Sequence, residues 1–136
     1  MAEIDIVGTR RRQYRDLSLS FGLNPVTHDV ITVADEEAVK RSIKTLLQTN
    51  VGEVPFFPTF GAHLRDLLFE PIDAFTTAQI DAEVRSCIEA FEPRVSILSL
   101  DVTPSIDELR YDVTLTLALL NLLEPITLTL FLKRQR

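Results

Sequence analysis

The chain of 136 residues is long enough for one domain that buries about two-thirds of its unfolded surface. Hydrophobic residues make up 46% and charged residues 25%, which excludes a disordered chain. No apolar run reaches the ~18 residues of a membrane span, and the first residues lack the basic-then-apolar order of a signal peptide. We therefore expect synthesis in the cytosol. Cys87 is the single cysteine, which excludes an internal disulfide.

The charge of the chain is unevenly distributed. The net charge is −6, yet the first 15 residues carry a local +2 and the last four carry +3. The acidic body between these basic ends disfavours binding to the phosphates of duplex nucleic acid. Basic ends fit docking onto acidic protein neighbours, and they equally fit tails kept solvated and sheet edges kept apart. We divide the chain into a basic extension, residues 1–14, and a single domain, residues 15–136.

The first part of the sequence predicts a strand followed by a helix. Residues 16–21 alternate polar residues with three apolar ones, as expected of a half-buried strand: Leu17, Leu19 and Phe21. Asn24-Pro25 favours a turn after this strand. Asp35 is placed to cap a helix that we expect to end near Asn50. The apolar stripe of that helix has the spacing of one face: Val39, Ile43, Leu46 and Leu47.

The middle of the chain predicts a loop and two further helices. The loop, residues 52–61, carries three phenylalanines that we expect either in the core or as anchors of an interface: Phe56, Phe57 and Phe60. A short helix follows, with its leucines turned inward: Leu64, Leu67 and Leu68. Thr76 and Gln79 fit a capping box at the start of a longer helix. The stripe of that helix is Ile80, Val84, Ile88 and Phe91, and Cys87 lies beside it as a small core residue.

The last third of the sequence predicts three strands. Residues 94–102 are apolar and β-branched, and their alternation shifts phase near Ile97-Leu98, which indicates a bulge. Odd residues are apolar from 109 to 119, and even residues are apolar from 126 to 133. The connections are too short for helical crossovers, which favours antiparallel pairing. The predicted fold class is α+β, with an N-terminal strand, two or three helices, and a C-terminal antiparallel sheet packed on the helices.

Candidate residues for catalysis are sparse. The two histidines, His28 and His63, lack the spacing of a zinc site, glycine is too scarce for a phosphate loop, and no nucleophile motif is present. We therefore expect no metal, no cofactor and no catalytic residue. Three acids beside proline or glycine could have raised pKa values and act as a hydrolase pair: Glu53, Glu70 and Glu92. Accidental pairs are common in a chain with 20 acids, so a hydrolase is the weaker alternative.

The segment Glu92-Pro93-Arg94 stands where a helix passes into a strand. A carboxylate at a helix C-terminus faces the negative end of the macrodipole, at a cost of ~0.3–1 kcal/mol. Pro93 moves Glu92 out of the α region and donates no hydrogen bond. The residues leave two interpretations open. One is an internal Glu92–Arg94 pair that stabilises a corner, and the other is a rigid corner that docks onto a partner, since arginine makes forked contacts with carboxylates.

Four motifs are together similar to a known family. They are N-P-V-T-H-D (24–29), A-V-K-R-S-I-K-T-L-L-Q-T-N-V-G-E-V-P-F-F-P-T-F-G (38–61), L-L-F-E-P (67–71) and F-E-P-R-V (91–95), in that order. They resemble the baseplate wedge subunits of contractile phage tails, the gene product 25-like family, which includes a baseplate component of the type VI secretion apparatus. The resemblance covers roughly residues 14–133. The Arg10–Arg12 run, and His28 where the family usually has glycine, depart from its pattern.

The resemblance implies structural work without catalysis, in the tail baseplate of a virion assembled in the host cytoplasm. It makes Glu92, Pro93 and Arg94 the docking site for baseplate wedge proteins, with the charge of the acid satisfied by contacts in the assembly. It also implies a sheath initiator, present in six copies per baseplate, that gives the tail sheath protein a surface to copy. It allows tail tube or hub proteins as further partners. The alternatives are a lysozyme-like peptidoglycan hydrolase and the same subunit in a type VI or other contractile injection system.

Strands at both ends of the chain supply the surface that the resemblance requires for the sheath. An exposed strand edge accepts a strand from another chain by β-augmentation. We expect the N-terminal and C-terminal strands to border one sheet that accepts an arm of the sheath, with these edge residues: Leu17, Leu19, Phe21, Ile126, Leu128, Leu130 and Leu132. We expect neither nucleic acid nor a membrane among the partners.

Overall fold

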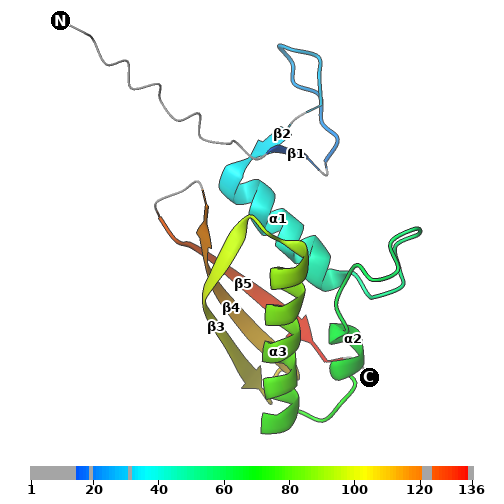
Figure 1. Cartoon of the computed structure of the whole chain (residues 1–136), viewed down its shortest axis with the longest axis vertical. Helices are drawn as coiled ribbons and strands as arrows, with labels where there is room; N and C mark the ends of the chain where they lie inside the picture. Colours follow the sequence, from blue (N-terminus) through cyan, green and yellow to red (C-terminus); the bar gives the residue numbers. More distant parts are fainter. Residues whose placement is uncertain (1–14, 19, 31, 121–123, 135–136) are drawn as a thin grey trace, which may run out of the picture.

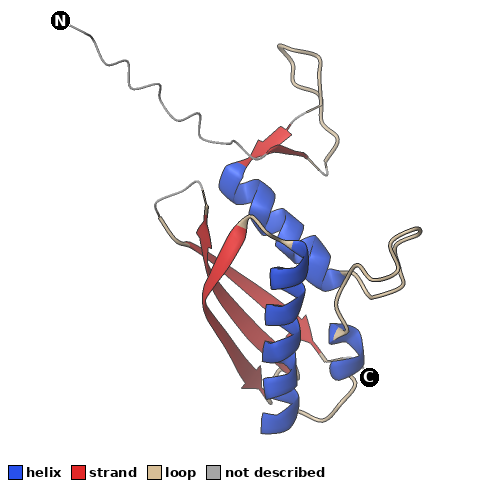
Figure 2. Ribbon diagram, viewed as in Figure 1, coloured by secondary structure: helices blue, strands red, loops and turns tan. Residues whose placement is uncertain are grey.

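The computed structural model describes residues 15–18, 20–30, 32–120 and 124–134. They form, in chain order, β1 (Arg15–Leu17), β2 (Thr32–Ala34), α1 (Asp35–Gln48), α2 (Leu64–Leu67), α3 (Ala74–Phe91), β3 (Val95–Ser105), β4 (Arg110–Leu119) and β5 (Ile126–Lys133) (Figures 1 and 2). The predicted basic extension, residues 1–14, lies outside this part of the chain. None of the helices described is long and apolar enough to cross a membrane.

The three C-terminal strands form an antiparallel sheet in the order β3-β4-β5, as predicted. In the central strand every odd residue from 111 to 119 is buried, none of them more than 3% exposed, while the even residues face the other side. This alternation is the period of two expected when one face of a sheet lies on a core. The register between β3 and β4 shifts between Ile97 and Ser99, which confirms the predicted bulge.

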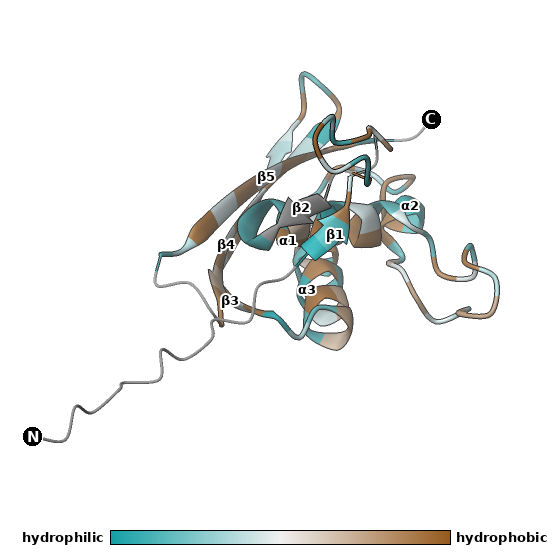
Figure 3. Cartoon of the chain, turned by 90° about the horizontal axis from the view of Figure 1, so that it is seen from above, coloured by the Kyte–Doolittle hydropathy of each residue, from teal (hydrophilic) through white to brown (hydrophobic). Residues whose placement is uncertain are grey.

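The helices cover one face of this sheet. Seen from above, α1, α2 and α3 lie on the same side of β3, β4 and β5, and no other described element covers the opposite face (Figure 3). The core between the layers is built from the helical stripes and the inward side chains of the strands: Val39, Ile43, Leu46, Ile80, Val84, Ile88, Val113, Leu115 and Leu117. Cys87 is buried among them, as predicted. The α+β class and the sheet packed on helices are therefore confirmed.

The N-terminal strand differs from the prediction. β1 is three residues long and pairs antiparallel with β2, in a two-stranded sheet separate from the C-terminal one. The strand therefore ends at Leu17, and the expectation that the strands at the two chain ends border one sheet is wrong. The alternation of apolar and polar residues suggested a half-buried face, but the apolar side chains here are exposed. Leu17 and Phe21 are 59% and 70% exposed, and Leu19 lies outside the described residues.

The start of α3 also differs from the prediction. The helix begins ahead of the proposed Thr76–Gln79 box, and its N-cap is Asp73. The Asp73 carboxylate accepts a hydrogen bond of 2.7 Å from the Thr76 backbone N–H, the contact that defines a cap. Thr76 is the third residue of the helix and lies buried in its first turn. Two overlapping cap motifs exist in the sequence, and the earlier one is used.

The loop between α1 and α2 divides the three phenylalanines. Phe60 packs edge-on against Phe91 of α3, with ring centroids 5.3 Å apart. Phe56 and Phe57 are 99% and 62% exposed. The core interpretation therefore holds for Phe60 alone. Gly61 closes the loop so tightly that an added Cβ would lie 2.5 Å from the Thr49 carbonyl oxygen.

Candidate functional site

The corner between α3 and β3 is formed by Glu92, Pro93 and Arg94. Glu92 is the C-cap of α3, with φ −124° and ψ 75°, and its N–H donates to the Ile88 carbonyl at 2.8 Å. The proline that follows prevents the helix from continuing. The Arg94 carbonyl accepts a hydrogen bond from Leu120 N–H at 3.2 Å, which attaches the far side of the corner to the end of β4. The corner is thus held at both ends by backbone contacts.

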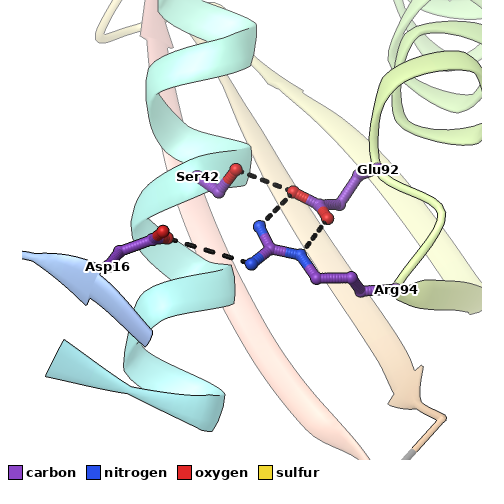
Figure 4. Close-up of polar contacts among 4 residues, drawn as sticks. All are labelled: Asp16, Ser42, Glu92 and Arg94. Carbon is purple, nitrogen blue, oxygen red and sulfur yellow. Dashed lines mark hydrogen bonds and ion pairs between the residues drawn. The ribbon is translucent and has the colours of Figure 1, made fainter. Parts of the chain in front are cut away.

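The Glu92 carboxylate is buried and fully engaged within the chain. The residue is 3% exposed. Arg94 binds it with a forked contact, in which Nε donates to Oε1 and Nη2 donates to Oε2 at 2.8 Å. Ser42 on α1 donates its hydroxyl to Oε2 at 2.7 Å (Figure 4). A charge removed from water requires partners of this kind, and two side chains provide them.

Arg94 extends the contact to the N-terminal hairpin. Its Nη1 lies 3.9 Å from Oδ2 of Asp16 on β1 (Figure 4). The Arg94 side chain is 21% exposed and that of Asp16 is 44% exposed, so this longer ion pair is partly solvated. One guanidinium therefore joins β1 to the corner, while the Glu92 carboxylate joins the corner to α1.

The pKa of Glu92 reflects two opposing effects. Burial removes water from the carboxylate and by itself would raise the pKa. The hydrogen bonds from Arg94 and Ser42, together with the charge of Arg94, outweigh burial and hold the pKa below the ordinary 4.5. Glu92 is therefore ionised at neutral pH. A general acid needs the opposite shift, so this residue does not fit that role in a hydrolase.

The structure confirms the first of the two sequence interpretations of this corner, an internal Glu92–Arg94 pair. The Glu92 charge is satisfied by Arg94 and Ser42 within the chain, so the expectation that contacts in the assembly satisfy it is wrong. Pro93 is exposed, and part of the Arg94 side chain remains accessible. A partner that docks here would meet these two residues, with Glu92 beneath them as the group that fixes the guanidinium.

The second candidate surface is the free edge of β5. The Arg134 N–H donates to the Leu109 carbonyl at 2.8 Å, which fixes the phase of the β4–β5 ladder. Because hydrogen-bonded and non-hydrogen-bonded pairs alternate, the even residues of β5 direct their N–H and C=O groups to β4. The odd residues direct theirs to the free edge: Thr127, Thr129, Phe131 and Lys133. The predicted residues Ile126, Leu128, Leu130 and Leu132 lie on this strand, but they face the core and pair with β4.

The outer edge of β3 is less suited to another strand. By the same alternation Pro104 occupies an outward position, where it offers no N–H. The bulge between Ile97 and Ser99 interrupts the edge a second time. Prolines and bulges are devices that block pairing between sheet edges. β5 contains neither, so the sheet has one blunted edge and one regular edge.

The acids and histidines considered for catalysis lie in different settings. The described residues contain no group of three or more His, Cys, Asp or Glu side chains that could hold a metal ion. Glu53 and Glu70 are exposed, and Glu53 Oε2 accepts a hydrogen bond from the Asn50 backbone N–H at 2.9 Å. His28 lies in the exposed turn of the hairpin, and the backbone N–H of His63 donates to Glu83.

Ser42 and Asp16 were missed by the sequence analysis. Ser42 is 50 residues from Glu92, and pairing over that distance depends on how α1 crosses the corner. A signal for Ser42 does exist, because it lies between Val39 and Ile43 near the inward face of α1. A small hydroxyl on an apolar face needs a hydrogen-bond partner. Asp16 has no comparable signal.

A family model described as "Baseplate wedge protein gp25" matches residues 33–121. The chain is 30% identical over 94 residues to baseplate wedge protein gp25 of Enterobacteria phage T4, covering 69% of this chain and 61% of that protein. It is 32% identical over 88 residues to baseplate protein W of Escherichia phage P2, covering 65% of this chain and 76% of that protein. The match thus spans less than two-thirds of the T4 protein.

Solved structures share the fold. A chain of the anti-feeding prophage baseplate superposes with a TM-score of 0.70 at 26% identity, covering 82% of this chain and 90% of that one. A Geobacter sulfurreducens protein whose name proposes a tail lysozyme superposes with a TM-score of 0.69 at 26% identity, covering 74% of this chain and 92% of that one. The resemblance read from the four sequence motifs is therefore confirmed, and the chain belongs to the family of baseplate wedge protein gp25.

Proposed function

We propose that this chain is a non-enzymatic structural subunit of a contractile phage tail baseplate, located in the virion tail and present in six copies. The T4 and P2 relatives are baseplate proteins by name. The observation that carries the proposal is the regular, unpaired edge of β5 in a member of this family, beside a rigid corner whose charges are already satisfied. Both features suit binding to other proteins, and neither provides a reacting group.

The first proposed contact joins the Glu92-Pro93-Arg94 corner to the baseplate wedge proteins. Glu92 holds the Arg94 guanidinium with a forked contact, so little side-chain freedom remains to be lost on binding. The exposed Pro93 adds a rigid apolar contact beside that charge. A close charge contact across a desolvated interface couples by ~1.5–7 kcal/mol, enough to make this corner important for docking.

A substitution at Pro93 tests this contact without breaking the internal pair. Glu70-Pro71 provides a matched control, because it is an exposed glutamate–proline dipeptide elsewhere on the surface. The chain carrying Pro93→Asp should no longer copurify with the wedge proteins of the same phage when they are expressed together, whereas Pro71→Asp should copurify normally. Equal recovery with both variants would remove the corner from the proposed interface.

The second proposed contact joins β5 to the tail sheath protein by strand addition. Thr127, Thr129, Phe131 and Lys133 offer the row of N–H and C=O groups that an added strand requires. Deletion of the whole strand is a poor test, because Ile126 and Leu130 are core residues at 3% and 8% exposure. A single proline at Thr129 removes one outward donor and leaves the ladder with β4 intact.

Thr129→Pro and Thr129→Val therefore form the test and its control. Baseplates assembled with Thr129→Pro should lack the first sheath ring in negative-stain electron micrographs, and baseplates with Thr129→Val should carry sheath of normal length. A thermal melt of each purified variant separates an edge defect from a folding defect. Normal sheath on the proline variant would refute strand addition at this edge.

A peptidoglycan hydrolase remains the second candidate, favoured by the similarity to the Geobacter protein. The discriminating assay measures release of peptidoglycan fragments by the wild-type chain and by Glu53→Ala, Glu70→Ala and Glu92→Ala. Activity in the wild type that one of these variants lacks would mean that the structural role is incomplete. The similarity to the anti-feeding prophage baseplate also fits the alternative that this chain is a baseplate subunit of another contractile injection system. Capsid and portal genes beside this gene would identify a phage.

A further inference from the structure

A groove opens beside the last residues of β5. It has a volume of about 330 Å³ and lies where β5 meets the end of α1 and the short helix α2. Three buried leucines line it: Leu47 of α1, Leu64 of α2, and Leu68 directly after α2. Phe131 and Lys133, two of the residues whose backbone groups face the free edge, line the side of the groove formed by β5. The groove and the edge are therefore one continuous surface.

The charged residues that line the groove are Arg65, Lys133 and Glu53. Arg65 of α2 lines it, is exposed, and makes no ion pair with any residue in the described part of the chain. Glu53 lines it as well, but one of its oxygens already accepts the Asn50 N–H. Arg65 is thus an available cation next to a leucine-lined hollow, and an occupant with a carboxylate would complement it.

The position of an added strand follows from sheet geometry. It would lie about 4.8 Å outside β5, and its side chains would alternate between the helix side and the open side of the sheet. The side chains on the helix side would lie over the groove. Successive residues on that side are two positions apart, so one can enter the leucine-lined hollow while the next reaches Arg65.

We propose that this groove selects the sheath strand, and that it accepts an apolar side chain and a carboxylate two residues away on the same face of that strand. The inference rests on the proposed strand addition at β5 and deepens it. Backbone pairing at an edge supplies affinity for any extended segment, whereas pockets for alternate side chains supply specificity. A baseplate subunit that starts one particular polymer needs that specificity.

The test uses a library of random ten-residue linear peptides displayed on yeast and selected against the purified full chain. Selection on the wild type should enrich an apolar residue two positions from Asp or Glu. Selection on Arg65→Glu should replace the acid with Lys or Arg at the same spacing, and a wild-type-selected peptide should bind this variant at least about tenfold more weakly. Thr129→Pro should enrich no extended motif, while Thr129→Val should behave as the wild type.

The outcomes separate this inference from the proposed function. Enriched peptides without the acid, peptides indifferent to Arg65→Glu, or no enrichment at all would each overturn the groove's role, even if sheath formation still depends on Thr129. The expected motif together with normal sheath on Thr129→Pro baseplates would instead overturn sheath templating at β5. The wild type could also dimerise in sedimentation runs while Thr129→Pro stays monomeric. That result would mean that the β5 edge binds a second copy of the chain, and it would overturn the proposal.

Discussion

Ser42 on α1 donates a hydrogen bond of 2.7 Å to Glu92, the C-cap of α3. The two positions are 50 residues apart in the sequence, and the contact connects the two long helices at the corner proposed as a docking site. It gives a buried carboxylate a second donor besides Arg94. The exposed corner therefore depends on a helix that presents none of the three corner residues itself.

The Ser42 hydroxyl should contribute measurably to stability. Ser42→Ala leaves one Glu92 oxygen with fewer donors in a buried site, and hydrogen bonds to charged groups contribute about 1.5–3 kcal/mol. We expect a decrease of that size in the free energy of unfolding measured in urea. Ser86→Ala, at an exposed position of α3, is the control and should change the value by no more than about 0.5 kcal/mol. Equal effects in the two variants would mean that the Ser42–Glu92 contact is absent in solution.

The Glu92–Arg94 pair should respond asymmetrically to substitution. Arg94→Ala leaves a carboxylate buried without its forked partner and should cost about 3–5 kcal/mol of unfolding free energy. Glu92→Gln keeps a hydrogen-bonding group of the same shape and should cost less. A cycle that includes the double variant Glu92→Gln/Arg94→Ala should give a coupling of ~0.5–3 kcal/mol. Additive losses in the cycle would contradict the pair.

The lowered pKa of Glu92 predicts a dependence of stability on pH. A group whose pKa falls on folding stabilises the folded state above its unfolded pKa, here near 4.5, and loses that contribution as the pH falls through the lowered value. The wild type should therefore lose stability relative to Glu92→Gln below about pH 4.5, with a constant difference above it. Unfolding in urea at several pH values measures this difference. Parallel curves through that range would show that Glu92 does not titrate as described.

The two described glycines with positive φ offer a test of the loop that carries the exposed phenylalanines. Gly52 has φ +85° and open space where a Cβ would lie, so Gly52→Ala should cost only about 1–2 kcal/mol of backbone strain. Gly61 has φ +121°, and an added Cβ would collide with the Thr49 carbonyl, so Gly61→Ala should cost at least about 3 kcal/mol. Thermal melts of the two variants compare them, and similar melting temperatures would contradict the close approach.

The sheet could be predicted from the sequence because patterns among neighbouring residues mark its strands and its bulge. The odd residues of β4 are apolar and buried one after another, and the phase shift near Leu98 marks the bulge directly. The short N-terminal strand could not be separated from a longer one, because Leu17 and Phe21 alternate with polar residues while remaining exposed. Alternation reports which residues share a side, and it does not report whether anything covers that side.

The candidate site was predicted in part. The sequence identified Glu92, Pro93 and Arg94 as a corner with a misplaced acid, and both interpretations of it could be written from those three residues. The choice between them needed Ser42 and Asp16, which reach the corner only after α1 and β1 are packed beside it. The strand that could accept a partner was also named, but the residues at its edge depend on the ladder phase that the Arg134–Leu109 hydrogen bond fixes.

The proline and the bulge on β3 make the two edges of the sheet unequal. Sheets open on both rims can join copy after copy into a fibre, because each new molecule offers the same unpaired rim as the last. This sheet closes one rim with Pro104 and the break after Ile97, and leaves the other regular. A molecule with one regular edge offers further copies of itself no second regular edge on which to continue a row of strands.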